Sequence, residues 1–296
     1  MKILLDTDIG SDIDDCLALA YLLAAEEVEL LGITTVAGRP HLRAQLAHAV
    51  CEAAGRRIPV AVGCAEPLSG TLRETDLTAA QRAVAEGCSV AYPEGESAIE
   101  LMRRTIEAHP HEVTLLAIGP LTNVATLFAR YPHIPALLCG LALMGGRYTD
   151  DPAFDTARWG RIEWNILCDV AAATAVLGES GVPILAVGVE QTCRFSLPPR
   201  PLKEVLWQDP ARRPVSASIT AAVDRIYFHD AVLAYALLAP EEVGLRRGRI
   251  TVDAEGRTVF TPAADGSVRI VTDYDPERFL AHYLNTLGIS LPPLRA

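Results

Sequence analysis

The chain has 296 residues, of which 50% are hydrophobic and 21% are charged, a composition that excludes disorder for the chain as a whole. Its 37 acidic and 26 basic residues give a net charge of −11. This argues against nucleic acid or an acidic membrane as partner, because phosphate-tracking surfaces need excess Lys and Arg. Seven scattered cysteines without C-x-x-C spacing, and apolar runs too short for a membrane span, predict a cytoplasmic protein with reduced thiols.

In chain order, short apolar runs alternate with helical segments rich in Ala and Leu. We expect strand Lys2–Leu5, helix Asp14–Glu26, strand Val28–Val36, helix Leu42–Ala54, strand Ile58–Val62, helix 97–108, strand Val113–Ile118, helix Leu121–Tyr131, strand 137–144, helix Val170–Leu177, strand Pro183–Val189 and helix 231–238. The strands are apolar throughout rather than alternating, which is typical of a parallel sheet that is covered on both faces.

Three segments interrupt this alternation. Pro132–Pro135 is expected to be a loop, and Arg194–Pro214, with five prolines, is expected to be a loop-rich excursion or lid. Near the C-terminus, Arg249–Val252 and Arg257–Thr261 flank a short glycine-containing turn and predict a hairpin. The predicted fold class is therefore α/β and Rossmann-like, with a mostly parallel central sheet, helices on both faces and a small C-terminal hairpin. We expect one domain over residues 1–296.

The segment after the first strand is densely acidic. It contains five carboxylates within ten residues, namely Asp6, Asp8, Asp12, Asp14 and Asp15. Ligands of a parallel sheet bind beyond the carboxyl ends of its strands, and like charges this close must be protonated, neutralised or bound to a cation. A solvated turn with helix caps accounts for only one or two of these acids. Because oxygen ligands favour Ca²⁺ or Mg²⁺, the sequence predicts a cation site here.

A second enzyme class also begins in this way. Phosphatases of the haloacid-dehalogenase type place D-x-D after their first strand, and Asp6 and Asp8 fit that spacing. Their chemistry usually needs a downstream Lys that balances the phosphoryl charge, and Lys203 in the proline-rich segment is the only candidate. The phosphatase is therefore the less favoured alternative.

Further motifs follow the other predicted strands. They are T-T-V-x-G at 34–38, G-P-L-T-N at 119–123, M-G-G at 144–146, E-x-N at 163–165 with Asp169 soon after, and H-D at 229–230. Together with D-T-D-x-G and D-D between Asp6 and Asp15, this ordered set closely resembles one family, the inosine–uridine-type nucleoside hydrolases. Each motif alone is weak, but the whole set in this order is highly specific.

The resemblance implies a calcium-dependent hydrolase that splits the N-glycosidic bond of a small-molecule ribonucleoside, releasing base and ribose. It also implies a homo-oligomer, a dimer or tetramer. Asp8 is implied to be the general base that activates water, Asp14 to bind a ribose hydroxyl, and Glu163 and Asn165 to bind the remaining sugar hydroxyls. The implied Ca²⁺ ligands are Asp8, Asp15, Asp230 and the carbonyl of Ile118.

His229 is the candidate acid that protonates the leaving base, because it precedes an implied metal ligand at the start of a predicted helix. A packing or hydrogen-bonding role is the alternative. The candidates for stacking on the base, with core packing as the alternative, are Tyr148, Trp159, Trp164 and Tyr227.

The sequence departs from the family pattern in places that bear on specificity. Extra residues lengthen the loop between Asp8 and Asp14, so the identity of the metal-binding aspartates can shift. Arg39 stands where the family often has an Asn that touches the ribose, and a guanidinium there suits an anionic group. A hydrolase of another ribosyl or ribosyl-phosphate compound is therefore an alternative. A catalytically inactive riboside-binding relative is a third, and the intact aspartates argue against it.

Overall fold

A nine-stranded sheet runs through the computed structural model, which describes residues 1–73, 76–92, 97–150, 154–220 and 223–292. The spatial order of the strands is β10-β9-β11-β6-β5-β4-β1-β2-β3. Their bounds are β1 (Lys2–Thr7), β2 (Glu29–Thr35), β3 (Val60–Val62), β4 (Val113–Ala117), β5 (Gly140–Met144), β6 (Ile184–Val187), β9 (Val243–Val252), β10 (Thr258–Pro262) and β11 (Val268–Tyr274). Within this sheet β9 alone runs in the direction opposite to the other eight strands, which confirms the predicted mostly parallel sheet and its C-terminal hairpin.

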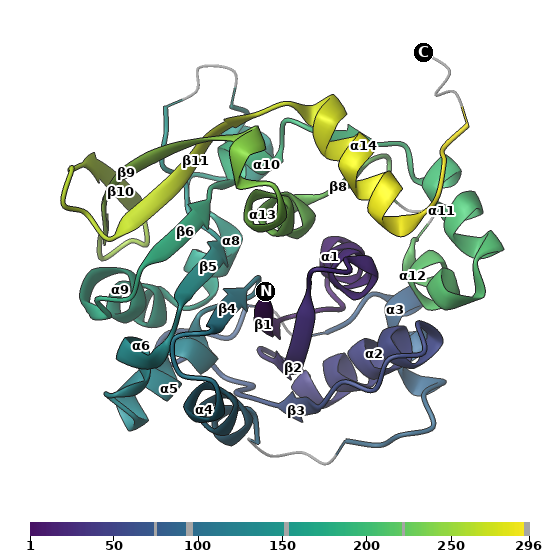
Figure 1. Cartoon of the computed structure of the whole chain (residues 1–296), viewed down its shortest axis with the longest axis horizontal. Coiled ribbons are helices and arrows are strands. Elements are labelled where there is room, and N and C mark those ends of the chain that lie inside the picture. The colour runs from purple at the N-terminus through teal and green to yellow at the C-terminus, as the bar shows by residue number, and fades with distance from the viewer. Residues whose placement is uncertain (74–75, 93–96, 151–153, 221–222, 293–296) are drawn as a thin grey trace.

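Helices cover both faces of this sheet (Figure 1). Their bounds are α1 (Asp14–Ala24), α2 (Pro40–Ala53), α3 (Ala79–Glu86), α4 (Ala98–Ala108), α5 (Thr122–Arg130), α6 (Ile134–Leu137), α7 (Thr156–Trp159), α8 (Trp164–Cys168), α9 (Val170–Glu179), α10 (Val189–Thr192), α11 (Pro199–Gln208), α12 (Arg213–Ser218), α13 (His229–Leu238) and α14 (Pro276–Leu287). Two further strands, β7 (Ser196–Leu197) and β8 (Ile226–Tyr227), pair with each other outside the main sheet. Within the described ranges, no helix has the length and apolar character needed to cross a membrane.

Successive residues of the strands face two separate apolar cores. In β1, Ile3 and Leu5 belong to the core that α1, α2, α13 and α14 cover. Leu4, between them, belongs to the core that α4, α5 and α9 cover on the opposite face. All three side chains are fully buried. A strand that is buried on both faces must be apolar at every position, and this is why the run at the N-terminus shows no alternation.

The proline-rich segment 194–214 is not the loop-rich excursion that the sequence predicts, because most of it is helical. It contains α11, a 3₁₀ turn at Pro210–Arg212, and the start of α12. Each of these elements has proline in its first turn, where the missing N–H leaves no helical hydrogen bond unmade. The predicted loop Pro132–Pro135 is wrong in the same way, since α6 begins at Ile134 with Pro135 in its first turn.

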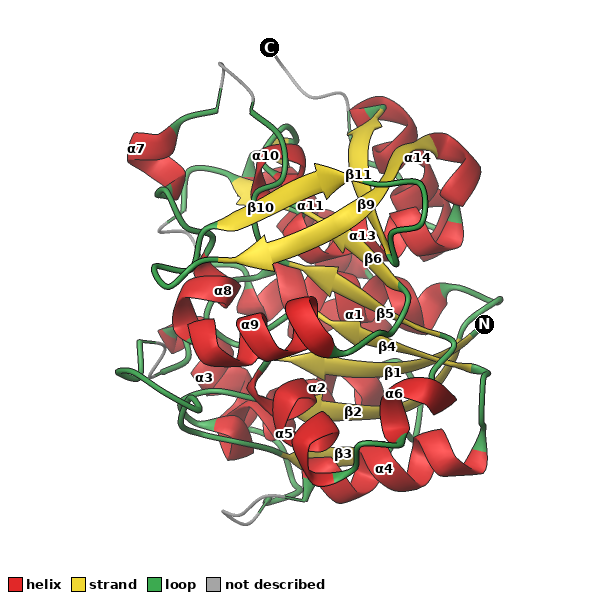
Figure 2. Ribbon diagram, turned by 90° about the vertical axis from the view of Figure 1, so that its left-hand side faces the viewer, coloured by secondary structure: helices red, strands yellow, loops and turns green. Residues whose placement is uncertain are grey.

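The strand order reverses beside β1, and this places the functional site. The chain builds β1, β2 and β3 toward one edge and then crosses to β4 on the other side of β1. The loops after β1 and β4 therefore diverge at the carboxyl edge, which leaves a crevice between them. The helices α1 and α13 lie side by side on one face of the sheet (Figure 1), and both begin at this edge. Figure 2 shows that the turn between β9 and β10 lies at the same edge.

Candidate active site

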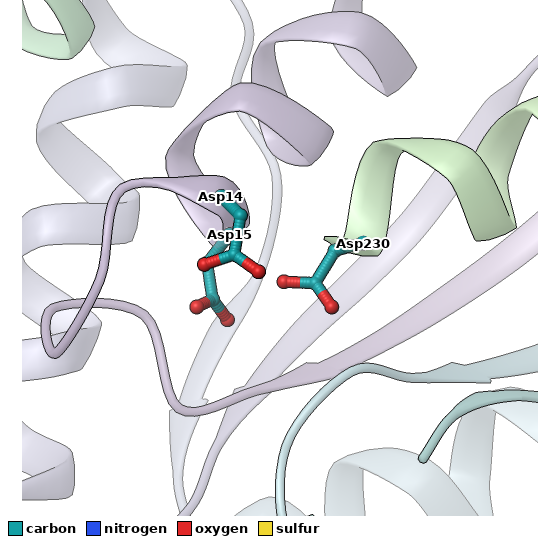
Figure 3. A group of neighbouring side chains, drawn as sticks. All are labelled: Asp14, Asp15 and Asp230. Carbon is teal, nitrogen blue, oxygen red and sulfur yellow. The ribbon is translucent and has the colours of Figure 1, made fainter. Parts of the chain in front are cut away.

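Three aspartates from two helices converge at this crevice. Asp14 and Asp15 open α1, and Asp230 is the second residue of α13, so all three lie in first helical turns, where the helix dipole favours negative charge. Oxygen atoms of the three carboxylates lie within 4.8 Å of one another, and Figure 3 shows the side chains pointing together. Burial, and then the charge of neighbouring aspartates, raises the pKa of each carboxyl well above its usual range. The group therefore needs either protons or a cation.

The acidic loop that precedes α1 is held from behind by a buried arginine. The Arg43 side chain is fully buried and donates from Nε to the Ala37 carbonyl at 2.8 Å. Its Nη1 donates to the Asp8 carbonyl, to the Ile9 carbonyl at 3.2 Å and to the Ser11 hydroxyl at 2.9 Å. One guanidinium thus ties residues 8, 9 and 11 of the acidic loop to Ala37, which fixes where Asp8 emerges.

Asp8 faces the same cavity from the end of β1. A Cβ built on Gly119 would lie 2.8 Å from the Asp8 Oδ1 atom, so the Asp8 carboxylate packs directly against the segment that follows β4. The neighbouring Ile118 carbonyl accepts a hydrogen bond from Asn165 Nδ2 at 3.1 Å. Asp8, Ile118 and Asn165 therefore meet at the junction of β1, β4 and α8.

Glu163 caps α8 and is held by backbone donors. Its Oε1 accepts from the N–H of Asn165 at 2.9 Å, and its Oε2 accepts from the N–H of Gly146 at 3.0 Å and of Ile166 at 3.1 Å. These bonds favour the ionised form, but burial dominates and raises the pKa of the carboxyl to about 7. Gly146 has a φ of 80°, and a Cβ there would collide with Tyr148 Oη. The M-G-G motif therefore supplies a tight turn that brings the Gly146 N–H to Glu163.

His229, the first residue of α13, also lines the cavity and is held by a hydroxyl and two rings. Its Nδ1 lies 2.6 Å from the Thr192 hydroxyl. The Tyr227 ring stacks on the imidazole at 5.5 Å between centroids, and the Trp159 ring meets it edge-on at 5.2 Å. Burial lowers the pKa of His229 to about 4, so the ring is neutral near pH 7.

One cavity of about 270 Å³ joins nearly all the residues that the sequence singled out. Its lining includes Asp8, Asp14, Asp15, Ile118, Glu163, Asn165, His229 and Asp230, with Trp159 and Trp164 among the aromatic candidates. Arg39 is not part of this lining. Its side chain is half exposed and its Nε lies 3.7 Å from Asp76 Oδ1, on the outer side of the loop. Tyr148 is buried and donates to the Gly145 carbonyl at 2.5 Å, which is a packing role.

The structure assigns other tasks to part of the acidic motif. Asp6 is fully buried and accepts from Thr34 Oγ1 and from Asn123 Nδ2, both at 2.7 Å. Burial raises its pKa to about 7. Asn123 also donates to the Thr35 carbonyl at 3.0 Å and accepts from the N–H of Cys64 at 2.9 Å. Asp6 and Asn123 therefore join β1, β2 and β3 beneath the cavity rather than lining it.

The sequence interpretation overlooked Arg43 and the role of Thr192. A signal for Arg43 existed, since it stands with Leu46, Ala47 and Val50 on what would be the apolar stripe of the helix. A charged residue on a buried stripe is informative because it needs partners. Thr192 carries no comparable signal, because its contact with His229 joins residues 37 positions apart.

The donor set of the cavity fits a hard divalent cation. The residues offer only oxygen atoms, from the buried carboxylates of Asp14, Asp15 and Asp230, with Asp8 and the Ile118 carbonyl on the adjoining wall. Such donors suit Ca²⁺ or Mg²⁺ and do not suit a thiolate- or imidazole-seeking metal. The acidic cluster can therefore bind a metal ion. The tight group contains Asp14, which the family resemblance implies to be a sugar ligand.

The family model described as inosine-uridine preferring nucleoside hydrolase matches residues 3–281. The chain therefore belongs to this family, and it is an enzyme of the ribonucleoside N-glycosidase class. Uridine nucleosidase 1 of Arabidopsis thaliana is 30% identical over 273 residues, which cover 86% of this chain and 79% of that protein. The inosine-uridine preferring nucleoside hydrolase of Leishmania major is 34% identical over 215 residues, covering 69% of this chain and 65% of that protein.

Solved structures agree with this fold. A plant nucleoside hydrolase superposes with a TM-score of 0.79 at 24% identity, covering 97% of this chain and 98% of that one. A purine-preferring ribonucleoside hydrolase from Gardnerella vaginalis gives a TM-score of 0.77 at 23% identity, with the same coverage. The predicted family and fold class are confirmed.

Proposed function

We propose that the protein hydrolyses the N-glycosidic bond of ribonucleosides with the help of a calcium ion held by the aspartate cluster. The observation that carries this proposal is the arrangement of one cavity. Its lining combines the Asp14–Asp15–Asp230 cluster with Glu163 and Asn165 from the start of α8 and with His229 from the start of α13. The aspartate cluster, the polar pair at α8 and the imidazole between two aromatic rings match the three parts of a ribonucleoside substrate: the vicinal hydroxyls, the 5′ end and the base.

The residues of the chain then divide the reaction between them. Asp8 accepts a proton from the attacking water, and Asp14 accepts a hydrogen bond from a ribose hydroxyl. Asp8, Asp15, Asp230 and the Ile118 carbonyl would hold the cation, which supplies positive charge that lowers the pKa of nearby water. The buried carboxylates stabilise the positive charge that develops on the sugar as the N–C1′ bond breaks. Glu163 and Asn165 orient the ribose, and His229 faces the leaving base.

A panel assay of released reducing sugar tests this function. With calcium present, uridine should be hydrolysed and 2′-deoxyuridine should be a very poor substrate. Loss of one vicinal hydroxyl leaves buried polar groups unpaired, which costs up to about 10⁴-fold in sites built around such bonds. Chelation should abolish the activity. Comparable kcat/KM for the two substrates would contradict the assigned sugar orientation. Full activity in metal-free protein would contradict the proposed requirement for calcium.

Paired variants separate a metal ligand from a nearby acid. Asp230→Asn removes a buried carboxylate of the cluster and should abolish both calcium binding, measured by calorimetry, and hydrolysis. Asp12→Asn is the matched control, because Asp12 is exposed at the rim and lies outside the tight cluster. Calcium binding without hydrolysis of any riboside would favour the inactive riboside-binding relative.

We also propose that the protein works in the cytoplasm as a homo-oligomer. Its seven cysteines are all free thiols, which suits a reducing compartment. Assembly as a dimer or tetramer rests on the family resemblance, and sedimentation analysis tests it.

A further inference from the structure

A second cavity, of about 290 Å³, adjoins the proposed ribose site and has a different chemistry. Glu163 lines both cavities, so they share this part of their walls. Three separate segments build the second cavity: the turn after β5 at 147–150, the residues 161–163 before α8, and residues 256–260, which end the hairpin turn and begin β10. Each of these segments contributes one arginine, namely Arg147, Arg161 and Arg257.

Hydrogen bonds and close packing fix these segments relative to one another. The Arg147 N–H donates to Thr258 Oγ1 at 2.8 Å, and the same hydroxyl donates back to the Arg147 carbonyl at 2.8 Å. A Cβ built on Gly256 would lie 2.9 Å from Val170 Cγ2 and 3.2 Å from Ile162 Cγ2. The hairpin turn thus packs directly on the segment that carries Glu163, so the distance between the two cavities is set by the fold.

The positive charge of this cavity is only partly neutralised. Arg147 lies over the Phe154 ring at 5.2 Å and 4.0 Å from the fully exposed Asp150, while Arg257 pairs with the exposed Glu255. Within the described part of the chain, Arg161 forms no ion pair. Ion pairs between exposed side chains are weak and exchange readily for a better partner. Three guanidinium groups around one hollow are notable in a protein with a net charge of −11.

We propose that this second cavity binds an anionic group on the 5′ side of the ribose, so that the enzyme accepts ribosides carrying a 5′-phosphate. The inference rests on the proposed function, because it requires the 5′ end of the sugar to lie against Glu163. Guanidinium groups bind phosphate oxygens through paired hydrogen bonds, and three of them exceed the charge of about −2 that a phosphate monoester carries, which leaves positive charge for the Asp150 and Glu163 carboxylates of the same lining. Arg39, which the sequence suggested for this task, lines neither cavity.

The hydrolysis of such a substrate balances without any further reactant. The N–C1′ bond breaks and the water oxygen bonds to C1′. One hydrogen of water stays on the new anomeric hydroxyl, and the other replaces the bond to C1′ on the released base. The products are the free base and ribose 5-phosphate, and the phosphate ester stays intact.

Binding and turnover together test the proposal. In the presence of calcium, calorimetry compares ribose 5-phosphate, ribose and orthophosphate, and a base-release assay compares uridine 5′-monophosphate with uridine. We expect ribose 5-phosphate to bind at least about tenfold more tightly than ribose, the value of one charge-assisted contact. In an Arg161→Gln, Arg257→Gln double variant this preference should disappear. Arg104→Gln, an exposed arginine on α4, is the control and should retain it.

Each outcome decides a different point. Equal binding of ribose 5-phosphate and ribose, or a preference that survives in the double variant, overturns the subsite. Orthophosphate that binds as tightly as ribose 5-phosphate, with no turnover of the monophosphate, also overturns it, because the cavity then holds free anions only. If uridine is hydrolysed while these results are found, the proposed function stands without the subsite. If no riboside is hydrolysed but the arginine-dependent preference is found, the proposed function fails and the anion site stands.

Discussion

At the scale of single residues, the environment of His229 decides what this side chain can contribute. Because burial lowers its pKa to about 4, the cation is rare near neutral pH and the ring acts in its neutral form. When the Thr192 hydroxyl donates to Nδ1, the ring hydrogen resides on Nε2, where the neutral ring can donate a hydrogen bond to a leaving base. The hydroxyl thus orients the imidazole, and it has a second acceptor in the Val189 carbonyl at 3.3 Å, so the ring hydrogen is on Nε2 only when the hydroxyl hydrogen points to Nδ1.

His229→Ala should therefore reduce kcat according to how much the leaving group needs a proton. For a natural base we expect a loss of about 10²–10⁴-fold, the usual range for one positioned donor. For a nitrophenyl riboside, whose leaving group needs little protonation, the loss should be much smaller. Asp8→Asn should damage both substrates, because it removes the base that activates water. Steady-state kinetics on the two substrates checks this.

Thr192 provides the control for this experiment. Thr192→Val removes the hydroxyl and should reproduce part of the His229→Ala defect with the same dependence on leaving group, whereas Thr192→Ser should retain activity. Equal losses on the two substrates in His229→Ala would make His229 a positioning residue beside Asp230.

Arg43 is the second residue whose burial gives it a definable task. Its guanidinium is fully buried and donates to the carbonyls of Ala37, Asp8 and Ile9. Arg43→Met keeps the length of the stem but leaves these acceptors unpaired and removes a positive charge that lowers the pKa of Asp15. We expect a loss of about 3 kcal/mol or more in the free energy of unfolding, measured in urea.

Arg200→Met is the matched control, since the Arg200 side chain is 87% exposed, and it should change stability by less than about 0.5 kcal/mol. If Arg43→Met were as mild as this control, the buried guanidinium would not be what holds the acidic loop.

At the scale of elements, the C-terminal hairpin supports the wall of the cavity that carries Glu163. Gly256, in the turn between β9 and β10, has φ of 93° and packs against Val170 and Ile162. Gly256→Ala should strain the backbone and push the turn off α8 and α9, at a cost of about 1–3 kcal/mol. It should also raise KM for ribonucleosides, because the segment of Glu163 shifts. Urea unfolding and steady-state kinetics measure the two effects.

Gly288→Ala separates packing from backbone strain. Gly288 ends α14 with φ of 64°, and a Cβ there would meet no atom within 4 Å. This control should cost only the strain of a left-handed residue, about 1 kcal/mol, and should leave KM unchanged. Identical effects of the two substitutions would show that the hairpin does not support the site.

At the scale of the whole molecule, buried acids make stability depend on pH and on the cation. Burial raises the pKa of Asp6 and Glu163 to about 7, and raises those of Asp14, Asp15 and Asp230 as well. The folded state therefore binds more protons than the unfolded state, so the stabilisation present at acidic pH is lost as pH rises through about 7. His229 has the opposite sign, but its contribution changes only between its lowered pKa of about 4 and its ordinary value of 6.5.

Metal-free protein should thus lose thermal stability as pH rises from about 6.5 through about 7, above the range in which His229 contributes. Calcium binds the ionised carboxylates of the native state, so it should raise Tm most at the higher pH by mass action. Calorimetric scans with chelator and with calcium measure this difference. A metal-free Tm that stays constant or rises over this interval would contradict the model of mutually repelling buried acids.

Features that repeat along the chain were predictable from the sequence. Non-alternating apolar strands separated by helices predict a parallel sheet with two covered faces, because burial imposes this pattern on every strand. Oxygen-rich motifs after successive strands predict one site at the carboxyl edge, because parallel strands end together there. Asp14, Asp15, Glu163, His229 and Asp230 were found in this way. The helices of 194–214 were missed because proline breaks a helix interior but is tolerated in the first turn, and sequence alone does not show where that turn begins.

Only the tertiary structure decided the contacts that join distant residues. Asp6 and Asp8 are both acidic and lie two positions apart, yet Asp6 lies within β1 and is buried with Asn123, whereas Asp8 follows the end of β1 and lines the cavity. Arg39 precedes α2 and Arg43 lies in its first turn, but the first is at the surface and the second is buried under the acidic loop. The three arginines of the second cavity come from segments up to 110 positions apart, so no local pattern marks them. The sequence determines which residues are charged and how apolar residues repeat along the chain. The tertiary structure determines which partner each charged side chain meets, because those partners come from distant segments.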